Sequence, residues 1–104
     1  VLNYIPSGLV GVVAIGTASL YLPSVFSLKE KRSVVKSLTE RIKARYNVSV
    51  AEVGDHELHG RTQIGVAAVS TRGDHAQHQI EAVFRFIEET RPDVVWIDSD
   101  IELV

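Results

Sequence analysis

Two amphipathic stretches, each bordered on both sides by short apolar runs, constrain the fold of this chain more than any other feature. Apolar residues recur every three or four positions in the stretches at 28–46 and 75–90, which is typical of helices with one buried face. The bordering runs are rich in Val, Ile and Thr or alternate apolar with polar residues, which is typical of strands. These runs span 10–22, 48–53, 62–70 and 94–104.

The resulting order, β-α-β-β-α-β, predicts an α+β fold of the ferredoxin-like (split βαβ) type with an antiparallel four-stranded sheet. Right-handed crossovers place both helices on one face of such a sheet, so the other face is open. A chain of 104 residues fits one domain. We expect a single domain over 11–104, preceded by a flexible extension over 1–10. The fold hosts many unrelated functions and predicts no activity by itself.

The beginning of the chain predicts neither export nor membrane insertion. A secretory signal needs a basic start, and no Lys or Arg precedes Lys29. The apolar run from Leu9 to Ala18 is too short for a bilayer-spanning helix, which takes about 20 residues. Cysteine is absent, which excludes disulfides and thiolate chemistry and fits a reducing compartment. We therefore expect a cytoplasmic protein with no membrane contact.

The first helix is predicted to begin in the segment SLKEKR, residues 27–32. Ser27 and Glu30 form a capping box, in which each side chain accepts a hydrogen bond from the other residue's backbone N–H. Leu28 belongs to the apolar stripe of the helix. Lys31 points along the same stripe, where its stem can pack while its ammonium group reaches water.

Four basic residues form a narrow stripe beside the apolar face of this helix: Lys29, Arg32, Lys36 and Lys43. Segment 27–46 holds seven basic and two acidic residues, a charge of +5, and the rest of the chain holds four basic and eleven acidic residues, a charge of −7. Lys29 and Arg32 also oppose the helix macrodipole, which disfavours cations near the N-terminus. The stripe is a candidate for RNA phosphate contacts that depend on charge alone. The alternative is a solvated helix face.

The open face of the sheet is a second candidate surface. The large apolar residues expected on it are Val13, Ile15, Tyr21 and Trp96. The last strand adds Asp98, Asp100 and Glu102, which would repel phosphate, and there is no pair of aromatic residues for stacking on RNA bases. The face therefore suits a protein partner or a homo-oligomer better than RNA. The alternative is scattered surface residues with no partner.

Two histidine pairs are candidates for metal binding. His56 and His59 lie in the loop between the second and third strands, and His75 and His78 lie at the start of the second helix. Imidazoles three residues apart can chelate zinc or nickel only when a third ligand converges on them. Nothing in the sequence brings the two pairs together. We therefore expect no metal site and no cofactor.

The other polar candidates are interpreted as structural. Asp74 is the expected N-cap of the second helix, with Gln77 completing a capping box. Glu52 and Asp55 could act as an acid–base pair only inside a pocket, and we interpret them as a surface residue and a turn cap. The chain has no phosphate-binding glycine loop, nucleophile elbow or H-E-x-x-H motif. We expect no catalytic residues, and a metal-dependent enzyme using the histidines and Asp55 is a remote alternative.

Several segments, taken in order, resemble the YlxP-like family of small bacterial proteins of unknown function, and the resemblance covers most of 11–104. The matching segments are SLKEKR at 27–32, VVKSL at 34–38, NVSVAEVGD at 47–55, IGVAAVS at 64–70 and FIEE at 86–89. The resemblance implies a compact ferredoxin-like domain without established catalytic residues. Genes of this family often lie beside those for translation and ribosome-maturation factors, including ribosome-binding factor A. Possible partners are thus ribosomal RNA and ribosome-maturation proteins.

The basic helix start of the family matches Lys29, Lys31 and Arg32. Our leading hypothesis is a non-catalytic bacterial module that contacts RNA or a ribonucleoprotein through the basic stripe of the first helix. The alternative is a protein-interaction or homo-oligomeric module that uses the open face of the sheet.

Overall fold

The computed structural model describes residues 11–104, so the expected extension over 1–10 lies outside the described residues. The elements are β1 (Val12–Tyr21), α1 (Leu28–Arg45), β2 (Ser49–Gly54), β3 (Arg61–Ser70), α2 (Gly73–Thr90) and β4 (Val95–Leu103). Every predicted element is present. Each bound lies within two residues of its expected position.

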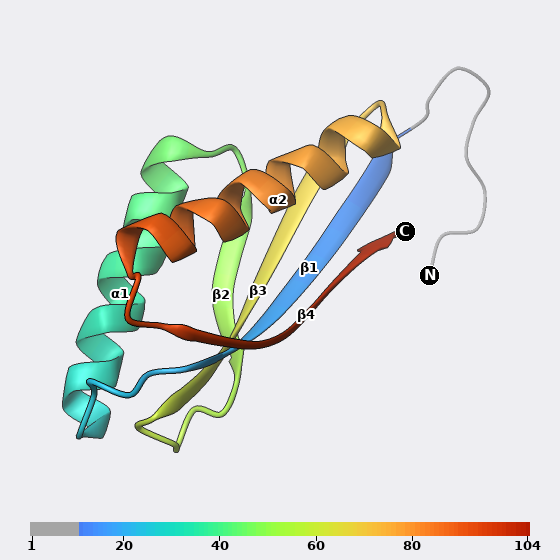
Figure 1. The fold of residues 1–104 in the computed structure, drawn as a ribbon. Coiled ribbons are helices and arrows are strands. Elements are labelled where there is room, and N and C mark those ends of the chain that lie inside the picture. Colours follow the sequence, from blue (N-terminus) through green and yellow to red (C-terminus); the bar gives the residue numbers. More distant parts are fainter. Residues whose placement is uncertain (1–10) are drawn as a thin grey trace.

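The strands form one antiparallel sheet in the order β2-β3-β1-β4. The two central strands, β1 and β3, are joined by ten consecutive residue pairs. Both helices lie on the same face of the sheet, and the other face is open (Figure 1). The prediction of a ferredoxin-like fold is confirmed.

The core lies between the helices and the inner face of the sheet. Its fully buried members include Ala14, Ala18, Leu20, Ile42, Ile64, Ile80, Val83 and Ile87. Gly16 belongs to the same face of β1, and a Cβ atom added there would collide with the side chain of Ile80 on α2. The helix therefore packs directly on the strand backbone at this point.

The start of α1 follows the sequence prediction. The Ser27 hydroxyl accepts a hydrogen bond from the backbone N–H of Glu30 at 3.0 Å, so Ser27 is the N-cap. At the other end the Tyr46 N–H donates to the Ile42 carbonyl at 2.8 Å. The cap fixes where the helix begins, and it thereby sets which side chains of SLKEKR face the core.

The predicted start of α2 is wrong. The helix begins at Gly73, and Arg72 rather than Asp74 occupies the N-cap position, without a side-chain cap bond. Asp74 lies in the first turn, where its carboxylate accepts hydrogen bonds from the Arg72 guanidinium at 2.6 and 3.0 Å. Hydrogen bonding from Arg72 lowers the pKa of the Asp74 carboxyl below its ordinary value. The proposed box with Gln77 is therefore absent, because Asp74 is already inside the helix and engaged by Arg72.

The expected position of Trp96 on the open face is also wrong. In the pairing of β1 with β4, Ser19 lies opposite Asp98 and Leu20 lies opposite Trp96, so Ile97 is an extra residue at a bulge. One extra residue interrupts the alternation, so Trp96 and Asp98, on either side of the bulge, lie on opposite faces of the sheet. Trp96 consequently points toward the helices, where its ring packs edge-on against Phe84 with 5.3 Å between centroids.

Candidate nucleic-acid interface

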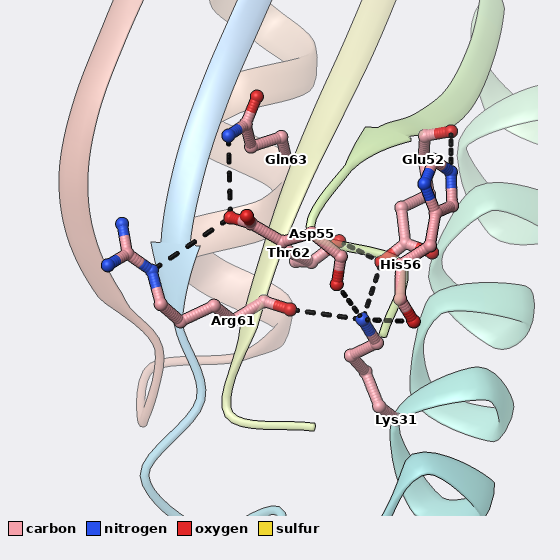
Figure 2. A network of polar contacts seen from close by, with 7 residues as sticks. All are labelled: Lys31, Glu52, Asp55, His56, Arg61, Thr62 and Gln63. Carbon is pink, nitrogen blue, oxygen red and sulfur yellow. Dashed lines mark hydrogen bonds and ion pairs between the residues drawn. The ribbon is translucent and has the colours of Figure 1, made fainter. Parts of the chain in front are cut away.

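The ammonium group of Lys31 lies in a cage of oxygen atoms, although the sequence analysis expects only its stem to be buried. Its side chain is 0% exposed. Nζ donates to the backbone carbonyls of Asp55, Arg61 and His56 at 2.6, 3.1 and 3.2 Å. It also lies 3.1 Å from the Glu52 carboxylate (Figure 2). The expectation that this ammonium group reaches water is therefore wrong.

The carboxylate that pairs with Lys31 is itself held in place. Thr62 donates its hydroxyl hydrogen to the Glu52 carboxylate at 2.6 Å. Glu52, which we expected on the surface, thus belongs to the inner face and has a side chain only 15% exposed. A buried ammonium group is stable only when its charge is paired and its N–H groups are bonded. The cage meets both conditions.

The β2–β3 loop takes its shape around this cage. Asp55 adopts a φ of 59°, a left-handed conformation that few residues other than glycine tolerate. Its carbonyl faces Lys31, and its carboxylate lies 3.4 Å from Gln63 Nε2 and 3.9 Å from Arg61 Nε. The expected role of Asp55 as a turn residue agrees with this geometry. Lys31 therefore joins the loop to the first turns of α1.

The basic stripe has the opposite environment. Its four members, Lys29, Arg32, Lys36 and Lys43, are exposed. Within residues 11–104, no carboxylate oxygen lies within 4.0 Å of a charged nitrogen atom of these four side chains. Their charge is therefore available to a ligand.

The two flanks of α1 differ in what they contact. The guanidinium groups of Arg41 and Arg45 lie over the Phe86 ring of α2, at 5.6 and 5.3 Å from its centroid. At about 100° per residue, the basic stripe falls on the opposite flank of the helix. The seven basic residues of segment 27–46 thus divide into one buried cation, a pair packed on α2 and an exposed stripe.

Phe26 is a surface residue that the sequence patterns do not single out. It lies in the β1–α1 connection directly before the cap, and it is 75% exposed. Val25 is buried, so the chain at this point turns one apolar side chain into the protein and the next one out. A helical or strand-like period cannot identify such a residue, because it belongs to neither element.

The β1–α1 connection is bonded to the α2–β4 connection. The Ser24 hydroxyl donates to the Asp93 carboxylate at 2.7 Å, and Arg91 lies 3.2 Å from the same oxygen. The Ser24 bond is the main cause that lowers the pKa of Asp93 below its ordinary value, with a smaller part from Arg91. The segment that leads into α1 is therefore held at a defined position.

The open face of the sheet carries an apolar hollow of about 370 Å³. Its outer-face lining includes Ile15, Thr17, Ala51, Val53, Gly65 and Ala67. Ile15 and Tyr21 are exposed on this face as expected, and Val13 is half-buried there. Asp98, Asp100 and Glu102 pair with outer-face residues of β1, so the carboxylates form one margin of the face.

The histidine pairs lie far apart. The β2–β3 loop with His56 and His59 is at one end of the molecule, and the start of α2 with His75 and His78 is at the other (Figure 1). The part of the chain that the structure describes contains no group of three or more His, Cys, Asp or Glu residues arranged to hold a metal ion. Neither described helix is long and apolar enough to cross a membrane.

Comparison with known proteins places the chain in a family. The family described as "Protein of unknown function (DUF503)" matches residues 13–101. The chain belongs to this family. The uncharacterized protein YlxP of Bacillus subtilis (strain 168) is 39% identical over 62 residues, which are 60% of this chain and 67% of that protein. The resemblance to the YlxP-like family is thereby confirmed.

A solved structure supports the fold alone. The de novo designed protein Foldit4 is similar with a TM-score of 0.52 and 15% sequence identity, over 90% of this chain and 96% of that one. A designed protein of this shape carries no information on a natural ligand. A ligand of this chain must therefore be inferred from its own geometry.

Proposed function

We propose that this protein is a non-catalytic RNA-binding module that contacts phosphate groups through the basic stripe of α1. The observation that carries the proposal is the exposure of Lys29, Arg32, Lys36 and Lys43 on one flank of one helix, without an ion-pair partner in residues 11–104. Four aligned cations suit a polyanion, because each cation that neutralises a phosphate releases a condensed counterion.

The distribution of charge over the whole chain supports the same proposal. When the buried Lys31–Glu52 pair is left out, segment 27–46 carries +4 and the remainder −6, so a polyanion is attracted to one side and repelled from the open face with Asp98, Asp100 and Glu102. Contacts of this kind position a nucleic acid without reading its bases. Ribosomal RNA is the partner that the family resemblance suggests, and a bacterial cytoplasmic setting goes with it.

The experiment measures the affinity of wild-type protein and the Lys29→Glu/Arg32→Glu/Lys36→Glu variant for a ribosomal RNA fragment at one fixed salt concentration. Reversal of three contacting charges is expected to weaken binding by at least about a thousandfold, since each charge-assisted contact contributes about 1.5–3 kcal/mol. Unchanged affinity in this variant would refute the proposal.

A matched pair of single variants controls for net charge. Lys36→Glu and Arg85→Glu change the charge equally, and both residues are exposed. Lys36 lies in the stripe, whereas Arg85 lies on α2. The proposal expects a clear loss of affinity for Lys36→Glu and a much smaller loss for Arg85→Glu. Equal losses would mean that only total charge matters.

The hollow on the open face supports a second candidate function, association with a second copy of the chain. A two-fold dimer centred on the hollow would bury Ile15 and Val53 and leave the carboxylates of β4 at the rim, where polar residues normally lie in interfaces. Sedimentation at micromolar concentration is expected to show a dimer for wild type and a monomer for Ala67→Glu. A wild-type monomer at these concentrations would exclude this candidate.

A further inference from the structure

We propose that Phe26 is a base-stacking residue that makes the RNA site of this protein selective for single strands with accessible bases. The proposal rests on the proposed function and adds a second kind of contact to it. In this arrangement Lys29 and Arg32 contact phosphates, and the Phe26 ring stacks on an unpaired base beside them.

Packing within residues 11–104 does not explain the exposure of Phe26. It is 75% exposed and is the most exposed large apolar side chain in residues 11–104, whereas Phe84 and Phe86 are each 8% exposed. The neighbouring Val25 already supplies the apolar contact of this loop with the protein, at 4% exposure. The ring of Phe26 is thus not needed for the core, yet it is presented to solvent at a defined place.

Chain geometry keeps the ring close to the basic stripe. Phe26 directly precedes the N-cap Ser27, and Lys29 lies in the first turn of α1. Three residues span at most about 11 Å between Cα atoms. Arg32 lies in the following turn of the helix. It remains close to Lys29, because each helical residue advances the chain by only about 1.5 Å along the axis. One short segment therefore carries an aromatic ring and two exposed cations, with Glu30 as the single acidic side chain among them.

The loop that carries the ring is held before any ligand arrives. Ser24 bonds to Asp93 at 2.7 Å, and the Val25 N–H donates to the Leu22 carbonyl at 3.2 Å. The Leu22 N–H in turn donates to the Gly60 carbonyl of the β2–β3 loop at 2.8 Å. Because the backbone that carries the ring is held in this way, less conformational entropy is lost in this loop on binding, which favours affinity.

Lys31 is a positioning residue at the end of the molecule that carries Phe26. The β1–α1 connection, the start of α1 and the β2–β3 loop all lie at this end (Figure 1). Lys31 joins the last two through its bonds to Asp55, His56 and Arg61 (Figure 2). The surface beside Phe26 and the cations is therefore preorganised rather than formed on binding.

An aromatic ring beside cations fits the chemistry of single-stranded RNA. Every base has a π-face, so stacking tolerates any sequence, while duplex RNA keeps its bases inside the helix. A protein partner would also gain from burying the Phe26 ring, but only an RNA partner would show a preference for a base-bearing strand over an abasic one. This difference separates the two classes of partner in the test.

The test compares two decamers with the same number of phosphates, a uridine RNA and an analogue that lacks its bases, at one salt concentration. Wild type is expected to bind the base-bearing decamer about 5- to 150-fold more tightly than the abasic one, the range found for one stacked base. Phe26→Ala and Phe26→Leu are expected to remove this preference, and Phe26→Trp is expected to keep it. Val69→Ala, which truncates an exposed apolar residue on the open face, is the control and is expected to change nothing.

The outcomes distinguish this inference from the proposed function. If wild type binds both decamers equally and the triple charge variant binds neither, the stripe contacts phosphates and the stacking role is refuted. If wild type binds neither decamer, both proposals fail. If Phe26→Leu retains the preference of wild type, the ring acts as an apolar contact and the stacking role is refuted as well.

Discussion

Lys29 and Lys31 are two residues apart, yet their ammonium groups lie in opposite environments. Lys29 is exposed without an ion-pair partner in residues 11–104, and Lys31 is fully buried in the oxygen cage. The helical period explains part of this difference, because it directs Lys31 toward the apolar stripe. The cage itself could not be predicted, since its carbonyls come from residues 24 to 30 positions further along the chain.

Replacing Lys31 with methionine should destabilise the protein strongly. The change leaves the Glu52 carboxylate and three carbonyls without their donor. Removal of one partner from a buried ion pair costs about 3–5 kcal/mol. Chemical denaturation of Lys31→Met beside Lys36→Met measures the difference, and Lys36→Met is expected to change stability by less than about 0.5 kcal/mol. Equal stability of the two variants would show that the Lys31 ammonium group is not bonded in the cage in solution.

The hydroxyl group of Ser24 should control the acidity of Asp93. In wild type the Ser24 bond lowers the pKa of this carboxyl, so its contribution to stability is present above the pKa of the unfolded chain and is lost as pH falls through the folded pKa. Ser24→Ala should raise the pKa of Asp93 toward its ordinary value. NMR titration of the Asp93 carboxyl carbon checks this, and an unchanged pKa would show that the bond does not form in solution.

At the scale of elements, local sequence patterns identify every helix and strand. They give the wrong position for individual residues where a contact with another residue or strand decides the geometry. The Ser27 cap is predicted because its bond is local. The start of α2 is missed because Arg72 engages Asp74 inside the helix. The inward position of Trp96 is missed because it depends on the bulge at Ile97. The bulge arises from the pairing of β4 with β1, and the alternating pattern of β4 alone gives no sign of it.

The contact of α2 with β1 should depend on Gly16. Its Cβ position in an alanine variant would overlap Ile80, so the helix must shift or change a rotamer. Overpacking of this kind costs about 1–3 kcal/mol. Gly16→Ala should therefore lower the free energy of unfolding by this amount. Gly11→Ala is the matched control, because no atom of the described residues 11–104 lies within 4 Å of the Cβ added there. A Gly16→Ala variant as stable as wild type would show that the helix stands further from the strand.

For the whole molecule, the order of elements was sufficient to predict the ferredoxin-like sheet with both helices on one face. The family description names no ligand, so the candidate site depends on which charges the fold leaves exposed. The sequence indicated the basic stripe through the spacing of its residues. It did not indicate Phe26, whose exposure depends on how the β1–α1 connection packs.

The two candidate surfaces should act independently. The basic stripe lies on the helix side of the sheet, and the hollow with Ala67 lies on the open side. Ala67→Glu is therefore expected to leave the affinity for RNA within about twofold of wild type, since distant sites are usually additive within about 0.5 kcal/mol. A larger loss would mean that RNA reaches the open face or that binding requires a dimer.

The salt dependence of RNA binding tests the central claim most directly. For single strands, the logarithm of the association constant falls with the logarithm of salt concentration by about 0.7 per neutralised phosphate. The fall should therefore be steeper for wild type than for Lys29→Glu/Arg32→Glu/Lys36→Glu, by about 2 in the magnitude of the slope. Lys36→Glu alone should give an intermediate slope. Identical slopes for wild type and the triple variant, or binding that does not change with salt, would contradict the assignment of the basic stripe as the RNA-binding surface.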